Sequence, residues 1–282
     1  MRDANDILEM IIKIAVDDEN ILAVCLNGSR ADKHAFCDQY SDFDIIYVVR
    51  EIRNYTTNQQ WFRQFGEVLI SQTPDVFTGY DFTGNEKFTK LMQFIDGSRI
   101  DLTLVDVTNM KHITQSTEPQ LVLLNKDNLP ELKNIFTCDD YLVGLPNQNE
   151  FFECVNEFWW VVPYVAKGLC RQEITYVKSH FEGILQEMLW KMLAWKLSLL
   201  YHKKIAFGKH YRYIKRYMNS QEYETFINTF ANGEVNDVWE KLFNICDFFD
   251  EQAQLVAVSL LLDYDKRIAG KMKAYITRIK ND

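Results

Sequence analysis

The sequence predicts an α+β protein in which a mixed-sheet domain is followed by an all-α helical-bundle domain. The first half of the chain alternates helical and strand-like patterns, whereas from Glu150 onward the pattern is helical almost without interruption. A length of 282 residues accommodates two ordinary domains. The pattern changes near residues 144–147, so we expect one domain over residues 1–145 and a second over residues 146–282.

The spacing of apolar side chains defines the elements of the first half. The expected helix covers residues 4–17, and the expected strands cover residues 21–26, 43–49, 67–72, 88–95 and 99–105. Asp96 and Gly97 separate the last two strands, and Asp-Gly between apolar runs is typical of a β-hairpin. The runs are rich in β-branched and aromatic residues, which favours a mixed sheet with helices packed on it.

The second half shows helical periodicity, and glycine and proline are sparse there. The expected helices cover residues 150–171, 174–202, 220–231, 235–262 and 265–280. No strand-like alternation interrupts them, so we expect these helices to pack together as a bundle.

Composition places the chain among folded proteins of the cytoplasm. Hydrophobic residues make up 47% and charged residues 25% of the sequence, and no run of about eighteen uncharged apolar residues predicts a membrane span. The first twenty residues carry acids throughout their apolar pattern, unlike a secretory signal. The six cysteines are scattered without a C-x-x-C pair, which indicates reduced thiols and a cytoplasmic protein.

Charge is distributed unevenly along the chain. Residues 1–145 contain 13 basic and 23 acidic side chains, whereas residues 146–282 contain 18 basic and 17 acidic ones. A protein that binds duplex nucleic acid normally presents a basic face to the phosphates. The acidic first half therefore argues against a nucleic-acid partner and suits metal ions or a cationic small molecule.

A glycine, a serine and an acid lie between the first two expected strands, and a second acid lies at the start of the second strand. Gly28 permits a sharp turn, and Ser29 offers a hydroxyl and an amide to an anion. If a helix follows Ser29, its N-terminus adds further unpaired N–H groups for a phosphate. Asp42 and Asp44 differ by two positions, so at the start of a strand their side chains project to the same side. Paired carboxylates repel unless a cation lies between them, and a hard cation that also contacts phosphate is typically magnesium.

Asp101 supplies a third acid on the second strand of the expected hairpin. Its neighbours Ile100 and Leu102 are apolar, so its carboxylate lies on the opposite face of that strand and needs a partner. If this strand lies beside the strand of Asp42 and Asp44, the three acids surround one or two metal ions, as in enzymes of phosphoryl displacement. Taken singly, a Gly-Ser pair is a common turn and a D-x-D pair a common solvated strand end.

These motifs resemble the polymerase-beta-like nucleotidyltransferases, and more closely the family of aminoglycoside 6-adenylyltransferases. The stretches that carry the resemblance are residues 26–30, 42–49, 96–104, 123–127, 156–160 and 167–169, in conserved order and spacing. Asn125 stands where this resemblance leads us to expect an acid. The resemblance extends from the first helix to near the C-terminus.

The resemblance implies transfer of AMP from ATP to the 6-hydroxyl of streptomycin, with release of pyrophosphate. Residues 1–145 would then be the nucleotidyltransferase domain, and residues 146–282 the helical substrate-binding domain. In this family Gly28 and Ser29 would hold the β- and γ-phosphates, while Asp42 and Asp44 bind Mg²⁺. Asp101 would join a metal or take the proton of the attacking hydroxyl.

Several further side chains are candidates for binding the two substrates. Arg30 could neutralise charge on the transferring group or form a surface ion pair, and Lys209, which we expect to open a helix, could reach the triphosphate or remain solvated. Glu157 and Trp160 offer a carboxylate and an aromatic face to a polycationic sugar. The alternatives are a solvated acid for Glu157 and core packing for Trp160.

Two other functions remain open at this point. The chain could transfer a nucleotide to another small-molecule or macromolecular hydroxyl, or it could bind a nucleotide without catalysis. We expect a monomer or a weak dimer that associates with neither nucleic acid nor membrane.

Overall fold

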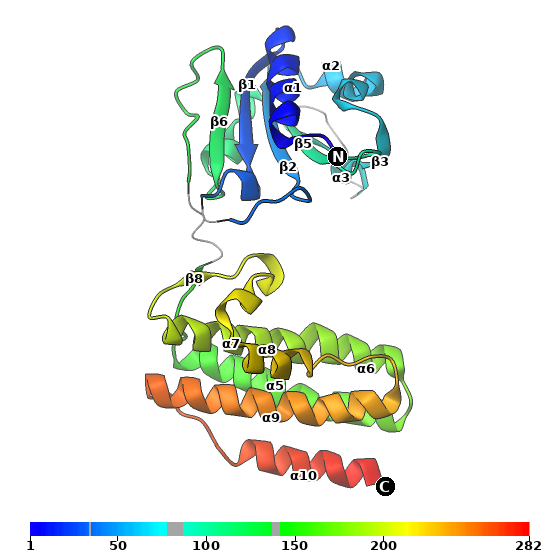
Figure 1. Cartoon of the computed structure of the whole chain (residues 1–282), viewed down its shortest axis with the longest axis vertical. Coiled ribbons are helices and arrows are strands. Elements are labelled where there is room, and N and C mark those ends of the chain that lie inside the picture. Colours follow the sequence, from blue (N-terminus) through cyan, green and yellow to red (C-terminus); the bar gives the residue numbers. More distant parts are fainter. Residues whose placement is uncertain (34, 78–86, 137–141, 282) are drawn as a thin grey trace. The chain divides into compact units, whose positions relative to one another are not determined.

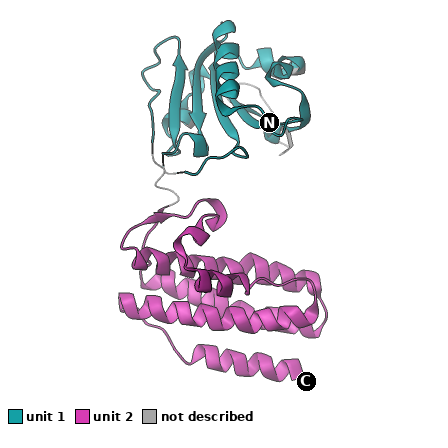
Figure 2. Cartoon of the chain, viewed as in Figure 1, with its two compact units in different colours: residues 1–140 teal, residues 141–282 magenta. Residues whose placement is uncertain are grey.

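The computed structural model describes residues 1–33, 35–77, 87–136 and 142–281 (Figure 1). The chain divides into two compact units, residues 1–140 and residues 141–282 (Figure 2). This division falls a few residues before the predicted boundary at 145. As expected, the first unit contains the main sheet and the second consists chiefly of helices (Figure 1).

A six-stranded mixed sheet forms the centre of the first unit, in the strand order β3-β4-β5-β2-β1-β6. The strands are β1 (Ile21–Asn27), β2 (Phe43–Val49), β3 (Val68–Gln72), β4 (Lys87–Phe94), β5 (Arg99–Asp106) and β6 (Gln120–Asn125). β2 and β5 pair in parallel, and the other neighbouring strands are antiparallel. The hairpin predicted around Asp96 and Gly97 joins β4 to β5.

Helix α1 (Ala4–Asp17) covers one face of this sheet, where it lies in front of β1 and β2 in Figure 1. Its buried residues Ile7 and Ile11 belong to a large apolar cluster together with Phe43 and Ile45 of β2. The Tyr47 hydroxyl donates a 2.7 Å hydrogen bond to the Ile11 carbonyl within this cluster. The larger core of the unit therefore lies on the α1 side of the sheet.

The opposite face carries a smaller apolar cluster. Cys25, Val48 and Val105 are fully or almost fully buried there, against Ile113 of helix α4 (Lys111–Thr114). The short helix α2 (Arg53–Thr56), whose Tyr55 belongs to the larger cluster, and the short helix α3 (Pro74–Phe77) complete the unit. Polar side chains can thus occupy part of this second face, because apolar packing there does not cover all of it.

Strand β6 was not predicted from the sequence. Its apolar run is only four residues long, with Pro119 and polar residues before it and Asn125 at its end. Asn125 has a structural task, because its side chain hydrogen-bonds both the amide and the carbonyl of Leu129. The turn explains why an amide is useful at the position where the family resemblance suggested an acid.

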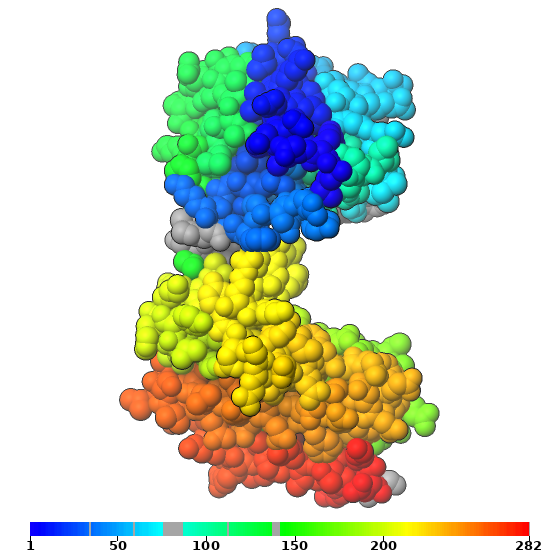
Figure 3. Space-filling model, viewed as in Figure 1, coloured from blue at the N-terminus to red at the C-terminus, as the bar shows by residue number. Residues whose placement is uncertain are grey.

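Helices form nearly all of the second unit. They are α5 (Gln148–Cys170), α6 (Ile174–His180), α7 (Gln186–Leu200), α8 (Ser220–Ile227), α9 (Val235–Leu260) and α10 (Ile268–Asn281). The single helix expected over 174–202 is interrupted by a π-helical turn, Phe181–Leu185. A two-stranded sheet of β7 (Leu142–Val143) and β8 (Ile205–Ala206) was not predicted. Helix α10, red in Figure 3, lies on the outside of this unit.

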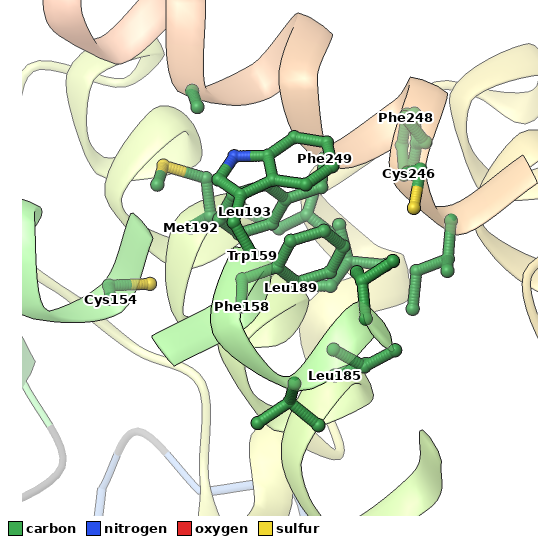
Figure 4. Packing of buried hydrophobic residues seen from close by; sticks show 14 of the residues in the cluster. Cys154, Phe158, Trp159, Leu185, Leu189, Met192, Leu193, Cys246, Phe248 and Phe249 are labelled. Carbon is green, nitrogen blue, oxygen red and sulfur yellow. The ribbon is translucent and has the colours of Figure 1, made fainter. Parts of the chain in front are cut away.

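Aromatic stacking between α5 and α9 holds the centre of the bundle. The rings of Phe158 and Phe249 are parallel within 3°, with their centroids 3.7 Å apart, and Trp159 packs edge-on against both (Figure 4). Phe158 is fully buried.

At the start of α5, Asn147 and Glu150 form a reciprocal capping box, which satisfies backbone groups that a helix end leaves unpaired.

Two observations concern membrane spans and cysteines. Within the described ranges, no helix is long and apolar enough to cross a membrane. The five described cysteines are free thiols, and Cys138 lies outside the described residues.

Removal of the stacked ring in α5 tests the packing of the second unit. Phe158→Ala should lower the free energy of unfolding by about 3–5 kcal/mol, because a cavity replaces a buried aromatic side chain. Phe152→Ala is the matched control, since Phe152 lies on the same helix with 60% of its surface exposed; its effect should stay below about 0.5 kcal/mol. Urea unfolding would measure both, and equal effects would contradict this packing.

Candidate active site

The pairing of β2 with β5 brings two of the predicted acids together. Asp44 lies opposite Asp101 in the parallel register of these strands. The neighbours Phe43 and Ile100 belong to the apolar cluster under α1, so both carboxylates lie on the other face of the sheet. Asp42 precedes β2, and its carboxylate lies 3.5 Å from the Arg99 guanidinium, which also binds Asp101. All three predicted acids therefore contribute to one region.

Two amide side chains extend this row of polar residues across the sheet. Asn27 lies opposite Asp44 in the β1–β2 register, and Gln120 lies opposite Asn27 in the β1–β6 register. Asn27 is 6% and Gln120 2% exposed, yet Asn27 Oδ1 and Gln120 Oε1 have no hydrogen-bond partner among the described residues. Buried unpaired oxygens are costly, so this row favours a bound cation or hydrogen-bond donor.

Gly28 follows β1 and lies directly against Asp44. Its φ of +68° is in the left-handed region, and an added Cβ would lie only 2.2 Å from Asp44 Oδ2. Only glycine fits this position without displacing the carboxylate. Ser29 belongs to the same short 3-10 turn, Gly28–Arg30, so one turn follows β1 rather than a longer helix that could present its N-terminus to phosphate.

Arg30 holds the loop that leads into β2. Its guanidinium donates hydrogen bonds to the carbonyls of Asp38, Ser41 and Asp42, at 2.8–3.2 Å. The same group stacks on the Phe43 ring at 3.9 Å from the centroid. These contacts give Arg30 the task of positioning Asp42 and Phe43, a task that the sequence did not indicate.

Arg99 is the principal cation of the site in this structure. It binds both carboxylate oxygens of Asp101, with Nε 2.8 Å from Oδ1 and Nη2 2.7 Å from Oδ2. Its Nε also lies 3.5 Å from Asp42 Oδ2. Hydrogen bonding to Asp101, together with the charges of the three acids, raises the pKa of Arg99.

Asp44 is the acid whose ionisation is most disfavoured. Burial is the largest cause, and the charges of Asp101, Asp42 and Glu118 add to it, so that the pKa of Asp44 is raised from 3.8 to about 6. Arg99 acts in the opposite direction. A carboxyl with such surroundings is typical of a site that binds a cation.

The chemistry of these donors fits a hard divalent cation. The row supplies carboxylate and amide oxygens, which are the ligands that Mg²⁺ prefers. Among the side chains that the structure describes, however, no three histidine, cysteine or acidic groups are arranged to ligate one ion. Both oxygens of the Asp101 carboxylate are bound by Arg99 instead.

The second unit presents an aromatic and acidic strip on the outer face of α5. Glu157 is exposed, and Trp160 is 63% exposed, whereas its neighbour Trp159 is buried in the core. Trp160 Nε1 donates a 2.8 Å hydrogen bond to the Tyr164 hydroxyl. The alternative of core packing is therefore wrong for Trp160.

Lys209 is exposed but does not open a helix. It begins a 3-10 turn of three residues, Lys209–Tyr211, in which His210 has a left-handed φ of 53°. Gly208 before it is also left-handed, with a φ of +72°. These conformations prevent helical continuation, so the expectation of a helix at Lys209 was wrong.

Four side chains of the site were not singled out from the sequence: Arg99, Asn27, Gln120 and Glu118. Arg99 could have been found, because it stands two residues before Asp101 on one strand and therefore shares its face. Asn27, Gln120 and Glu118 depend on the pairing of β6 beside β1, which no local pattern indicated.

The chain as a whole is similar to several known proteins. Residues 1–279 match the family described as streptomycin adenylyltransferase. An aminoglycoside 6-adenylyltransferase of Bacillus subtilis (strain 168) is 30% identical to this chain, over 99% of the chain and 100% of the relative. One from Campylobacter jejuni is 31% identical over 99% of this chain and 96% of its own. The crystal structure of an aminoglycoside 6-adenyltransferase from Bacillus subtilis matches the whole chain with a TM-score of 0.50 and 27% identity.

The close approach of Gly28 to Asp44 predicts a strong effect of one methyl group. Gly28→Ala should lower the free energy of unfolding by about 2 kcal/mol or more, through backbone strain and displacement of the carboxylate. Gly270→Ala is the control, because an added Cβ there meets open space in α10. Thermal unfolding compares the two variants, and a neutral Gly28→Ala would contradict the packing of Gly28 on Asp44.

The pKa of Asp44 predicts how the stability of the metal-free protein depends on pH. Because this pKa is raised from 3.8 to about 6 on folding, the native state holds a proton there that the unfolded chain releases. Its stabilising contribution is thus complete below about pH 4 and is lost as the pH rises to about 6. Between about pH 4 and pH 6, Asp44→Asn should reduce the loss in free energy of unfolding by about 1–3 kcal/mol, as measured by urea unfolding with EDTA. If the free energy of unfolding depended on pH equally in the variant and the wild type, the raised pKa of Asp44 would be contradicted.

Proposed function

The chain belongs to the streptomycin adenylyltransferase family, and from this membership we propose that it transfers AMP from ATP to the 6-hydroxyl of streptomycin with release of pyrophosphate. The observation that supports this proposal best is the row of Asp44 and Asp101 on neighbouring strands, with Gly28 packed directly against Asp44. A triphosphate site where β1 ends and β2 begins requires both acids and a backbone that can approach the phosphates closely.

The first unit supplies the nucleotide site in this proposal. Gly28 and Ser29 form the turn that accepts the β- and γ-phosphates, because a glycine turn lets backbone amides approach an anion closely. Asp42, Asp44 and Asp101 would hold Mg²⁺, which when bound neutralises charge on the triphosphate. Arg30 fixes the loop that carries Asp42.

Proton transfer is the second task of these acids. The attacking hydroxyl of the sugar is a poor nucleophile at neutral pH, so a carboxylate that accepts its proton accelerates attack on the α-phosphate. Asp101 is one candidate, and an acid of the second unit is the other. Asp101 must first exchange its contact with Arg99, because both of its oxygens are hydrogen-bonded in this structure.

The second unit supplies the acceptor site in this proposal. Streptomycin carries guanidinium groups, which carboxylates bind in a charged pair and aromatic rings bind through their faces. Glu153, Glu157 and Trp160 are exposed along α5, and Tyr164 extends the strip. Lys209, which is also exposed, is the proposed contact of this unit with the triphosphate. The acidic balance of residues 1–145 argues against a nucleic acid as the acceptor.

One assay tests the reaction and the acceptor together. Purified protein is incubated with Mg²⁺, ATP labelled on the α-phosphate, and separately with streptomycin, other aminoglycosides and a lincosamide. Label should appear on streptomycin, at the 6-hydroxyl, with one pyrophosphate released per product. Label on another acceptor would replace the proposed substrate, and tight ATP binding without any labelled product would indicate a non-catalytic nucleotide-binding protein. Asp44→Asn provides the inactive control.

The exposed indole of α5 predicts a substrate-specific effect. Trp160→Ala should raise the KM for streptomycin about tenfold, because a lost cation–π contact is worth roughly 1–2 kcal/mol. The KM for ATP should stay unchanged. Phe152→Ala removes another exposed ring from the same helix and serves as the control. Equal KM values for streptomycin in all three proteins would exclude Trp160 from the acceptor site.

A further inference from the structure

Arg99 makes the shortest charged contacts of the acidic row. Its guanidinium forms a fork on Asp101, with hydrogen bonds of 2.8 and 2.7 Å to the two carboxylate oxygens. The same side chain reaches Asp42 Oδ2 at 3.5 Å. The Asp101 side chain is 18% exposed and that of Arg99 is 39% exposed, so the pair is partly shielded from water. Shielding makes this pair stronger than an ordinary surface ion pair.

The position of Arg99 is fixed by the strand that carries it. Arg99 and Asp101 are separated by one residue on β5, so their side chains emerge on the same face. The fork therefore needs no loop movement to form. β2 brings Asp42 and Asp44 to the same region. A guanidinium is always charged in a protein, so the side chain stays with the acids.

The fork changes what Asp101 can do. It uses lone pairs on both oxygens and places a full positive charge against the carboxylate. A divalent cation that approaches this row must compete with that charge at Asp101 and Asp42. Loss of the guanidinium would remove this positive charge from beside Asp101 and Asp42 and would therefore make the row more attractive to a cation.

We propose that Arg99 is a positioning residue that acts as a built-in counter-ion of the site. It holds Asp101 and Asp42 in the nucleotide-free protein and competes with a bare divalent cation for them. When a cation arrives together with a triphosphate, the phosphate oxygens offer the guanidinium a second partner, and Asp101 is released. The site is thereby selective for the cation–nucleotide complex over the cation alone. This inference rests on the proposed nucleotidyl transfer.

Binding of Mn²⁺ to the full-length, nucleotide-free protein tests this proposal without any turnover. Free Mn²⁺ is measured by electron paramagnetic resonance in a titration at pH 7.5. Arg99→Gln should bind Mn²⁺ about tenfold more tightly than the wild type, which corresponds to about 1.4 kcal/mol. Arg99→Lys, which keeps the charge but loses the fork, should lie between them. Addition of ATP should reduce the difference between the proteins.

Arg50→Gln is the matched control. Arg50 pairs with Asp127 at 2.7 Å on the surface of the same unit, so this variant removes one guanidinium–carboxylate pair and the same net charge. Its Mn²⁺ affinity should equal that of the wild type. In an Asp101→Asn background, the gain from Arg99→Gln should shrink to about threefold or less, because the principal partner is gone.

Several outcomes would overturn the proposal. An affinity of Arg99→Gln within twofold of the wild type, or weaker than it, would show that Arg99 does not compete with the cation. A tenfold gain that persists in the Asp101→Asn background would show that it acts elsewhere. Thermal unfolding verifies the fold, and if Arg99→Gln does not fold, Arg99→Lys carries the comparison. Because neither drug nor transfer enters this measurement, its result is independent of the acceptor assay.

Discussion

The parallel pairing of β2 with β5 is the constraint on which the candidate site depends. Its register places Asp44 opposite Asp101, and strand alternation sends both carboxylates to the face away from α1. A shift by one residue would bury these acids among the apolar side chains under α1. The large cluster that includes Phe43 and Ile45 therefore enforces this register, because burial of apolar side chains on one face determines which residues occupy the other.

Like charges on neighbouring strands make this arrangement unfavourable without a counter-ion. Burial first, and then the charges of the neighbouring acids, raise the pKa of Asp44. The fork of Arg99 on Asp101, and the amide oxygens of Asn27 and Gln120 that have no hydrogen-bond partner among the described residues, belong to the same partly buried row of oxygen atoms. Such a row lowers stability locally and favours ligands that bring positive charge. Stability and proposed function are thus opposed in this part of the sheet, as they often are at active sites.

Much of the sheet and of the acidic row could be predicted from the sequence, because local residue patterns determined them. Apolar runs located β1, β2 and β5, the Asp-Gly pair located the hairpin, and alternation placed Asp101 on its polar face. Strand β6, the pairing of Asn27 with Gln120 and the left-handed turn at Lys209 could not be predicted, since each depends on contacts between distant segments or on unusual backbone angles. Arg99 is an intermediate case. The strand pattern places it on the same face as Asp101, but its contact with Asp42 depends on the pairing of β5 with β2.

In the proposed function, Asp42, Asp44 and Asp101, together with the turn at Gly28 and Ser29, form one site for a triphosphate and its metal ion. A crystal structure of the protein with Mg²⁺ and a non-hydrolysable ATP analogue would reveal such a site. We expect Mg²⁺ bound by Asp42 and Asp44, the β- and γ-phosphates against the Gly28–Ser29 turn, and Arg99 turned from Asp101 toward phosphate oxygens. A nucleotide bound elsewhere, or a metal ion that none of the three acids contacts, would contradict it.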